Sequence, residues 1–300
     1  MTSAVQVGIV VRAKDRPWFL ARALQDIAAQ DFTGWKVCIV NDGGDAAAVE
    51  GVLADIPDEV RERVVVSHNT CSRGRSAAAN QGIRELDSEH LVLHDDDDLW
   101  HPRFLSETVA WLNSHPDDIG VVVRTEIVLE EARDGGFVET GRETFWADID
   151  EIRLSDLVEI NRWVPISYLY RRVLHDRVGF YDEELHAAED WDLGLRTLPK
   201  YRIGFLDGVP LAFWMHRPGI EGDLGNSMFA LASHHERYDV RIRDAALREY
   251  VRSHGSGLPL FLVRQLREIV REEIGRALDA RPSDMDRVRR RLRALRHGKS

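Results

Sequence analysis

The stretch His90–Pro102 reads HLVLHDDDDLWHP, so an apolar run is followed directly by four consecutive aspartates. Leu91–Leu93 has the composition of a buried strand, whereas adjacent carboxylates repel one another and disfavour regular structure. Asp95–Asp98 is therefore either a solvated turn before a helix or an oxygen-rich site for a cation such as Mg²⁺ or Mn²⁺. Considered alone, the cluster favours neither interpretation, and the surrounding chain has to decide between them.

Strand-like and helix-like segments alternate through the first third of the chain. Short apolar and β-branched runs lie at Val5–Val11, Trp35–Val40, Val64–Ser67 and His90–Leu93. Between them, apolar side chains recur at helical spacing in Trp18–Ala29, Ala46–Ile56 and Ser76–Leu86. The alternation predicts right-handed crossovers and an α/β fold, with a mostly parallel sheet that helices cover on both faces.

Three polar segments each follow a predicted strand, at Arg12–Arg16, Asn41–Asp45 and Asp95–Asp98. Ligands of parallel sheets bind beyond the carboxyl ends of the strands, so these segments are expected to meet at one edge. This placement favours the cation interpretation of the acidic cluster. Asp42-Gly43-Gly44 is expected to form a sharp turn that exposes Asp42 to a ligand, although an ordinary Asp-Gly turn has the same residues.

The rest of the chain is less regular. Helices are expected at Pro102–Asn113, Leu154–Ile160 and Glu189–Leu198, and strands at Ile119–Leu129, Tyr201–Leu206 and Val209–Trp214. Asp134-Gly135-Gly136 predicts the turn of a hairpin that continues into Phe137–Phe145. Beyond Asn226 the pattern is helical, with a break near Ser253–Pro259.

Three further motifs combine charged side chains with small or aromatic residues. Arg73–Gly82 (RGRSAAANQG) predicts a helix whose N-terminus and arginines suit a diphosphate, or else a plain helix start. His186–Arg196 (HAAEDWDLGLR) places Asp190 in the first turn of a helix, where a carboxylate is either a cap or a general base. Phe213–Gly219 (FWMHRPG) ends a predicted strand with a histidine that precedes a loop.

In this order and spacing, the motifs resemble the family 2 glycosyltransferases of GT-A fold. The resemblance covers about residues 5–217 and rests on the polar loop after the first strand, the Asp-Gly turn, the G-x-S-x-A-x-N-x-G helix start, the aspartate cluster before Leu-Trp, and E-D-W-D-L-x-x-R. It implies a Rossmann-like GT-A domain over residues 1–225, with a nucleotide-binding half at 1–118 and an acceptor-binding half at 119–225. Residues 226–300 would form a helical C-terminal extension with a basic tail.

The resemblance implies an inverting glycosyltransferase of the hexosyltransferase type that uses Mn²⁺ or Mg²⁺ and serves polysaccharide or glycoconjugate biosynthesis. The donor would be a UDP- or dTDP-sugar. The acceptor would be a hydroxyl of a carbohydrate, a lipid-linked molecule or a small molecule. A bound divalent cation would stabilise the negative charge that develops on the leaving nucleoside diphosphate.

Matching the family motifs residue by residue implies a role for each candidate side chain. Asp190 corresponds to the general base, and the surroundings of the nucleobase correspond to Ala13, Arg16 and Asp42. Arg75 would lie near the ribose or diphosphate, and the ribose and donor sugar would be bound by Asp95 and Asp96. The metal would be held by Asp97, with Asp98 as the alternative ligand and His216 as a further one.

Two departures from the family pattern concern the nucleobase. Family members have a Pro-Thr-Tyr-Asn type of loop where this chain has Val11–Asp15 (VRAKD). The usual Asp-Asp-Gly-Ser becomes Asn41–Gly44 (NDGG), which removes one carboxylate near the base. Both departures bear on the choice of donor base more than on the class of reaction.

Composition narrows the class of protein. The chain has 300 residues, of which 44% are apolar, enough for one large domain or for a domain with an appendage. A net charge of −11 argues against a nucleic-acid binder. Two cysteines, Cys38 and Cys71, are too few for a disulfide framework. The sequence shows neither a signal-peptide pattern nor an apolar run of membrane length, which predicts a soluble cytoplasmic protein.

The C-terminal end is basic although the chain is acidic. Residues 281–300 hold seven Arg and one Lys against two Asp, a net charge of +6. This tail is solvated, or pairs with the acidic body, or contacts an anionic membrane surface, which would place the protein at the inner face of the membrane. The sequence also leaves a homodimer open.

Two other functions stay open. A sugar nucleotidyltransferase also uses a nucleotide-binding α/β domain and a metal, but Val11–Arg16 has no glycine where such an enzyme carries a Gly-rich loop. A catalytically inactive GT-A scaffold or sugar-binding module is the non-enzymatic alternative. The carboxylates suited to a metal and to a general base argue against it.

Overall fold

The computed structural model describes residues 5–133, 135–220, 222 and 232–279. It divides into two compact units, Met1–Asp239 and Val240–Ser300, whose boundary falls inside one long helix. The domain boundary expected after residue 225 stays a prediction.

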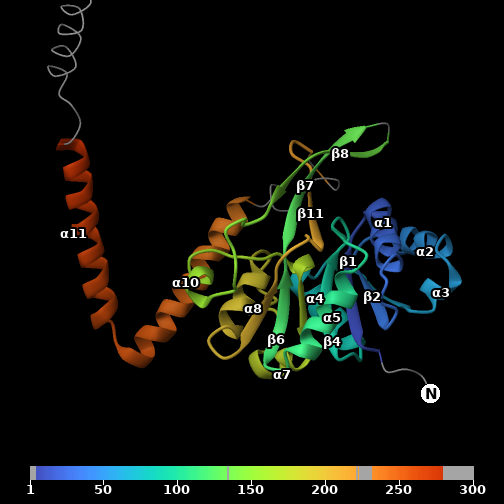
Figure 1. Ribbon diagram of the computed structural model, residues 1–300, viewed down its shortest axis with the longest axis horizontal. Coiled ribbons are helices and arrows are strands. Elements are labelled where there is room, and N and C mark those ends of the chain that lie inside the picture. Colours follow the sequence, from blue (N-terminus) through green and yellow to red (C-terminus); the bar gives the residue numbers. More distant parts are fainter. Residues whose placement is uncertain (1–4, 134, 221, 223–231, 280–300) are drawn as a thin grey trace, which may run out of the picture. The chain divides into compact units, whose positions relative to one another are not determined.

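The centre of the first unit is a seven-stranded sheet in the order β10-β6-β9-β4-β1-β2-β3 (Figure 1). Its strands are β1 (Val7–Ala13), β2 (Trp35–Asp42), β3 (Val64–Asn69), β4 (His90–Asp95), β6 (Asp118–Val123), β9 (Tyr168–Arg171) and β10 (Arg202–Leu206). Neighbouring strands are parallel except at β9, which runs antiparallel to both β4 and β6. The mostly parallel α/β sheet is confirmed, and the additional strand β9 escaped the sequence pattern.

Helices connect and cover these strands. They are α1 (Pro17–Ala28), α2 (Ala46–Ala54), α3 (Asp58–Arg61), α4 (Arg75–Glu85), α5 (Phe104–Ser114), α6 (Leu154–Leu157), α7 (Val173–Val178) and α8 (Glu189–Thr197), with a 3₁₀ turn, η1, at Pro165–Ser167. Successive residues of β1 point to opposite faces of the main sheet. Ile9 joins the core built with α1, α2 and α5, whereas Val10 faces α4, where only a glycine (Gly82) leaves room for it. The expected helix Leu154–Ile160 is shorter than predicted and ends at Leu157.

A second, four-stranded sheet follows the order β5-β11-β7-β8. It consists of β5 (Leu99–Trp100), β7 (Thr125–Arg133), β8 (Gly136–Thr144) and β11 (Ala212–His216). The β7–β8 hairpin confirms the predicted pairing, and Figure 1 shows it standing out beyond the main sheet. Asp134 of the predicted turn lies outside the described residues.

The single long strand predicted over Ile119–Leu129 is wrong. The strand is interrupted at Arg124, so that β6 pairs in the main sheet and β7 pairs in the second sheet. Arg124 is buried, and its guanidinium donates to Asp207 and to the carbonyls of Trp146 and Ile149. These partners lie far along the sequence, and an apolar run does not reveal them.

The C-terminal region is helical, as predicted. Helix α10 (Ala232–His254) and helix α11 (Gly257–Asp279) are separated at Gly255, whose φ of +77° suits glycine. No described helix is long and apolar enough to span a membrane. The basic tail 281–300 lies outside the described residues.

Candidate active site

The carboxyl ends of β1, β2 and β4 meet at one edge of the main sheet, as the sequence predicts. Arg12 is in register with Asp95 of β4, and Ala13 is in register with Asn41 of β2. The loops beyond these strands also contact one another, because the backbone N–H of Asp45 donates to Asp15 Oδ1 at 2.9 Å. The three polar segments singled out in the sequence are therefore neighbours in the fold.

Asp42 lies at the end of β2 and is buried among hydrogen-bond donors. Its carboxylate accepts bonds from the side chains of Asn69 and Ser72 and from the backbone N–H groups of Arg73 and Gly74. Burial alone would raise its pKa, but these four donors outweigh burial and lower it. In this structure Asp42 fixes the loop before α4, and its predicted contact with a nucleobase stays a prediction.

Asp95 lies between two arginines that also reach Glu189, the first residue of α8. Arg12 contacts Asp95 and donates to Glu189 Oε1 at 2.9 Å. Arg75 lies 3.3 Å from Asp95 and 3.5 Å from Glu189. Burial would raise the pKa of both acids, but the arginines outweigh it, lowering the pKa of Asp95 to about 2 and that of Glu189 as well.

Arg12 and Glu189 are functional candidates that the sequence reasoning missed. Arg12 is 8% exposed at the end of the apolar run Val7–Val11, and a buried arginine that ends such a run signals a paired charge. Glu189 begins the predicted helix Glu189–Leu198, and at the start of a helix the sequence does not distinguish a capping carboxylate from a buried ion pair. Together they tie the start of α8 to the edge of the sheet.

Asp190, the predicted base, follows Glu189 in the first turn of α8 and is partly buried. Asn161 donates to its Oδ2 at 2.8 Å. Burial, and then the neighbouring Glu189, raise its pKa to about 6, while the bond from Asn161 and the charge of Arg75 act in the other direction. Ala188, just before the acidic pair, has a φ of +62°, a strained conformation of the kind found at functional sites.

Asp96 and Arg16 form a buried pair on the other side of the cluster. Arg16, at the start of α1, contacts both carboxylate oxygens of Asp96, which is fully buried, and lies 3.3 Å from Asp97. Burial raises the pKa of Asp96 to about 7 although Arg16 opposes it. The predicted residues Arg16, Asp96 and Asp97 are thus brought together.

Asp97 also contacts Arg217, a fully buried residue that the sequence reasoning did not single out. Arg217 in turn lies 3.1 Å from Glu130 of β7, and Glu130 lies 2.7 Å from Arg22 of α1. Arg22 connects this chain of contacts back to Asp97, because it donates to the backbone carbonyl of Asp97 at 2.7 Å. No local pattern around Glu130 distinguishes it from the surface acids of its hairpin, which explains why it was missed.

Asp98 and His216 differ from Asp97 in their surroundings. Asp98 Oδ1 accepts the backbone N–H of Met215 at 2.9 Å, and burial together with Asp97 and Asp95 raises its pKa. His216 is buried at the end of β11, where burial and Arg217 lower its pKa to about 4, so the ring is uncharged at neutral pH.

A divalent cation suits part of this donor set. In the part of the chain that the structure describes, no three His, Cys, Asp or Glu side chains converge to hold a metal ion. The carboxylate of Asp97 is a ligand that both Mg²⁺ and Mn²⁺ accept. The uncharged imidazole of His216, which lies within electrostatic range of Asp97, is a ligand that Mn²⁺ accepts. In this structure arginines neutralise Asp97 instead.

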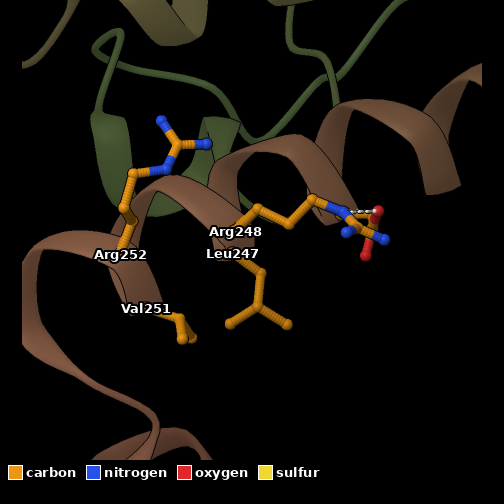
Figure 2. A pocket seen from close by; sticks show the side chains of 5 residues that line it. Leu247, Arg248, Val251 and Arg252 are labelled. Atoms are coloured by element: carbon orange, nitrogen blue, oxygen red, sulfur yellow. Dashed lines mark hydrogen bonds and ion pairs between the residues drawn. The ribbon is translucent and has the colours of Figure 1, made fainter.

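A hollow on α10 offers no comparable chemistry. It is lined by Asp244, Leu247, Arg248, Val251 and Arg252. Figure 2 shows Leu247 and Val251 projecting to the same side of the helix, while Arg248 pairs with Asp244 at 2.6 Å. One apolar pair beside an exposed ion pair makes this a surface feature, and the edge of the main sheet remains the candidate active site.

Comparison with known proteins identifies the family. The family model described as Glycosyl transferase family 2 matches residues 8–166. The uncharacterized glycosyltransferase YwdF of Bacillus subtilis (strain 168) is 28% identical over 206 residues, which cover 66% of this chain and 70% of YwdF. The uncharacterized glycosyltransferase RT0329 of Rickettsia typhi is 22% identical over 64% of this chain and 58% of its own length.

Two solved structures share the fold. S. aureus TarS 1-349 in complex with UDP-GlcNAc has a TM-score of 0.58 at 16% identity, over 84% of this chain and 75% of that one. The mannosyltransferase PcManGT from Pyrobaculum calidifontis, in complex with GDP-Man and Mn²⁺, has a TM-score of 0.57 at 18% identity, over 82% and 65%. With a family match over more than half of its length and this fold, the chain belongs to glycosyl transferase family 2 and is a glycosyltransferase of GT-A fold.

Proposed function

We propose that the enzyme transfers a sugar from a nucleotide-diphosphate donor to an acceptor hydroxyl with inversion, and that Asp190 is its general base. The observation that carries the proposal is the position of Asp190 in the first turn of α8, next to Glu189, which Arg12 and Arg75 bind together with Asp95; burial there raises the pKa of Asp190 to about 6. A carboxylate tuned toward neutral pH is ionised at pH 7 and still basic enough to accept a proton from an attacking hydroxyl.

The arginines at the sheet edge would bind the donor. Arg75 begins α4, and a diphosphate there would meet both its guanidinium and the N-terminal end of the helix. Arg16 pairs with Asp96, which is itself a candidate for binding the donor, so we place Arg16 beside the nucleotide as well. Neighbouring solved structures contain UDP-GlcNAc or GDP-Man, so we propose a nucleotide sugar as donor, with UDP- or dTDP-sugars to be tested before others.

We further propose that Asp97 and His216 hold a divalent cation and that Asp98 does not. Asp98 is engaged with a backbone N–H and has a raised pKa, whereas Asp97 accepts charged donors that a cation can replace. When bound, Mn²⁺ or Mg²⁺ would stabilise the negative charge on the leaving nucleoside diphosphate. The protein's own part would be to supply the carboxylate of Asp97 and the uncharged imidazole of His216, which lie within electrostatic range of each other.

A donor screen tests the first part of the proposal. Thermal unfolding of the full chain would be followed with UDP-, dTDP- and GDP-sugars, each with and without Mn²⁺. We expect one donor class to raise the melting temperature, and to raise it more with Mn²⁺, because a ligand stabilises the folded state that binds it. If no sugar nucleotide shifts the transition, the donor proposal fails.

Substitution of the base tests the second part. With the donor found in the screen and a panel of sugar acceptors, Asp190→Asn should keep donor affinity and lose transfer by about 10²–10⁴-fold. Asp192→Asn is the matched control, since Asp192 lies in the same helical turn and pairs with Arg196 at 2.8 Å. Transfer at the wild-type rate by Asp190→Asn would show that another group is the base.

A further inference from the structure

Glu130 of β7 is the meeting point of two arginines. Its Oε1 accepts from Arg22 Nη1 at 2.7 Å, and its Oε2 accepts from Arg217 Nη1 at 3.1 Å. Glu130 is 5% exposed and Arg217 is fully buried, so both charges have left bulk water. Charges in this position are stable only while each compensates the lost hydration of the other.

Both arginines also reach Asp97. Arg217 contacts Asp97 Oδ2 through Nη2, and Arg22 donates from its own Nη2 to the backbone carbonyl of Asp97. Arg217 thus divides one guanidinium between two acids, with one nitrogen on Glu130 and the other on Asp97. The ring of Phe19 lies 4.5 Å from the guanidinium carbon and helps to hold it there.

We propose that Glu130 is a positioning residue that allows Asp97 to exchange Arg217 for a divalent cation. Arg217 Nη2 and Arg16 Nη1 both contact Oδ2 of Asp97, so a cation that ligates this carboxylate would bind more tightly as the buried nitrogen of Arg217 withdraws. The contact between Nη1 and Glu130 persists through the exchange and keeps the buried guanidinium compensated. This inference rests on the cation role of Asp97 proposed above.

This arrangement predicts whether each of two substitutions strengthens or weakens the binding of a divalent cation. Glu130→Gln keeps the size of the side chain but removes its charge, so Arg217 is bound more strongly to Asp97 and the cation competes less well. Arg22→Met leaves the charge of Glu130 to Arg217 and removes a positive charge beside Asp97, which favours the cation. A purely structural role for the cluster would instead weaken cation binding in both variants.

Titration of Mn²⁺ into the full chain, followed by the electron paramagnetic resonance signal of the free ion with and without UDP, measures this affinity directly. We expect Glu130→Gln to weaken Mn²⁺ binding by about tenfold, and Arg22→Met to strengthen it. Glu139→Gln is the matched control. Glu139 is the cross-strand neighbour of Glu130 on β8, and its ion pair with Arg142 is half exposed. It should bind Mn²⁺ like the wild type.

The outcomes separate this inference from the proposed function. A wild type that binds Mn²⁺ beside a Glu130→Gln variant of equal affinity overturns the inference alone. A wild type that does not bind Mn²⁺ overturns the cation role of Asp97 and the inference with it. If circular dichroism shows that Glu130→Gln does not fold, Arg22→Met decides, and an affinity equal to or below that of the wild type overturns the inference.

Discussion

At the scale of single residues, the proposed base Asp190 lowers the stability of the folded state when it is ionised. Its pKa is raised from 3.8 to about 6, chiefly by burial, so the folded state holds the proton more tightly than the unfolded chain does. The cost of ionising the group in the folded state is absent below pH about 4 and fully present above pH about 6. The burial that would suit Asp190 to the proposed role of general base therefore lowers stability.

Asp190→Asn should therefore stabilise the protein at pH 8 while lowering transfer by about 10²–10⁴-fold. We expect a gain on the order of 1 kcal/mol in the free energy of unfolding, kept small because the carboxylate is partly exposed to solvent. Denaturant unfolding at pH 8 and at pH 4 measures the gain, which should vanish at the lower pH. A gain of equal size at both pH values would contradict the assignment of the ionisation cost to this residue.

Asn161 tunes the same carboxylate and offers a test through the pH profile. Its side chain donates to Asp190 and lowers the pKa, so Asn161→Ala should raise that pKa above about 6. Because the base must be ionised, the acidic limb of kcat/KM should move to higher pH while the plateau at high pH stays near the wild-type value. A uniform loss of rate at every pH would indicate a structural role instead.

At the scale of elements, the turn after β2 depends on one glycine. Gly43 has a φ of +82°, and a Cβ there would lie 2.4 Å from the backbone nitrogen of Ser72. The turn thus brings the end of β2 against the loop that Asp42 binds. The sequence pattern Asp-Gly-Gly predicted the sharp turn, but the close approach of the second loop came from the tertiary structure.

Gly43→Ala should destabilise the protein by on the order of 1–3 kcal/mol, because the backbone conformation and the space both exclude a side chain. Gly51→Ala is its counterpart inside α2, where a Cβ would meet no atom within 4 Å. That variant should gain about 0.5–1 kcal/mol from the better helix propensity of alanine. Melting curves of the two variants check both signs, and the same sign for both would refute the argument.

The elements differ in how far local sequence predicted them. β1, β2 and β4 were predicted from apolar runs because each is buried on both faces of the sheet, and the edge strand β3, which is only half-buried, was predicted from its β-branched run Val64–Val66. β9 was missed since YLYR is four residues long and is defined by antiparallel pairing with β4 and β6. The Ile119–Leu129 run was read as one strand because its apolar pattern continues through the bend at Arg124, which distant partners stabilise.

At the scale of the whole molecule, Arg12 joins the edge of the main sheet to α8. It is 177 residues from Glu189 along the chain, yet its guanidinium binds Glu189 and Asp95 together. Arg12 and Glu189 are buried and the side chain of Asp95 is only 15% exposed, so neither acid regains full hydration if the arginine is lost. This contact places Asp190 at the edge of the sheet, where the other candidate residues lie.

Arg12→Met should lower the free energy of unfolding by about 3–5 kcal/mol, since it leaves two buried carboxylates with Arg75 alone. The double variant Arg12→Met/Glu189→Gln should lose less than the sum of the single losses, because one uncompensated charge has gone. Arg61→Met, which breaks an exposed pair with Asp58, should change stability by less than about 1 kcal/mol. Additive losses in the double variant would mean that the two side chains are not coupled.

The second unit exposes apolar side chains to solvent. Helix α11 exposes large apolar side chains along its length, among them Leu262, Leu266, Ile269 and Val270, each about half exposed. Its arginines pair with glutamates one turn away, as Arg264 does with Glu268 at 3.0 Å. The contacts of the basic tail with a membrane, and a homodimer, stay predictions, since neither the fold nor the family similarity bears on them.

The sequence by itself determined the strand–helix alternation, the order of the acidic and glycine motifs, and so the fold class and the family. These depend on local propensity and on periodicity, which are written in neighbouring residues. The tertiary structure alone decided the partners of each charge: Arg12 for Asp95 and Glu189, Arg217 and Glu130 for Asp97, and a backbone N–H for Asp98. The physical reason is that ionisation depends on burial and on charges brought close by folding, and the residues that supply both lie up to 177 positions apart in the chain.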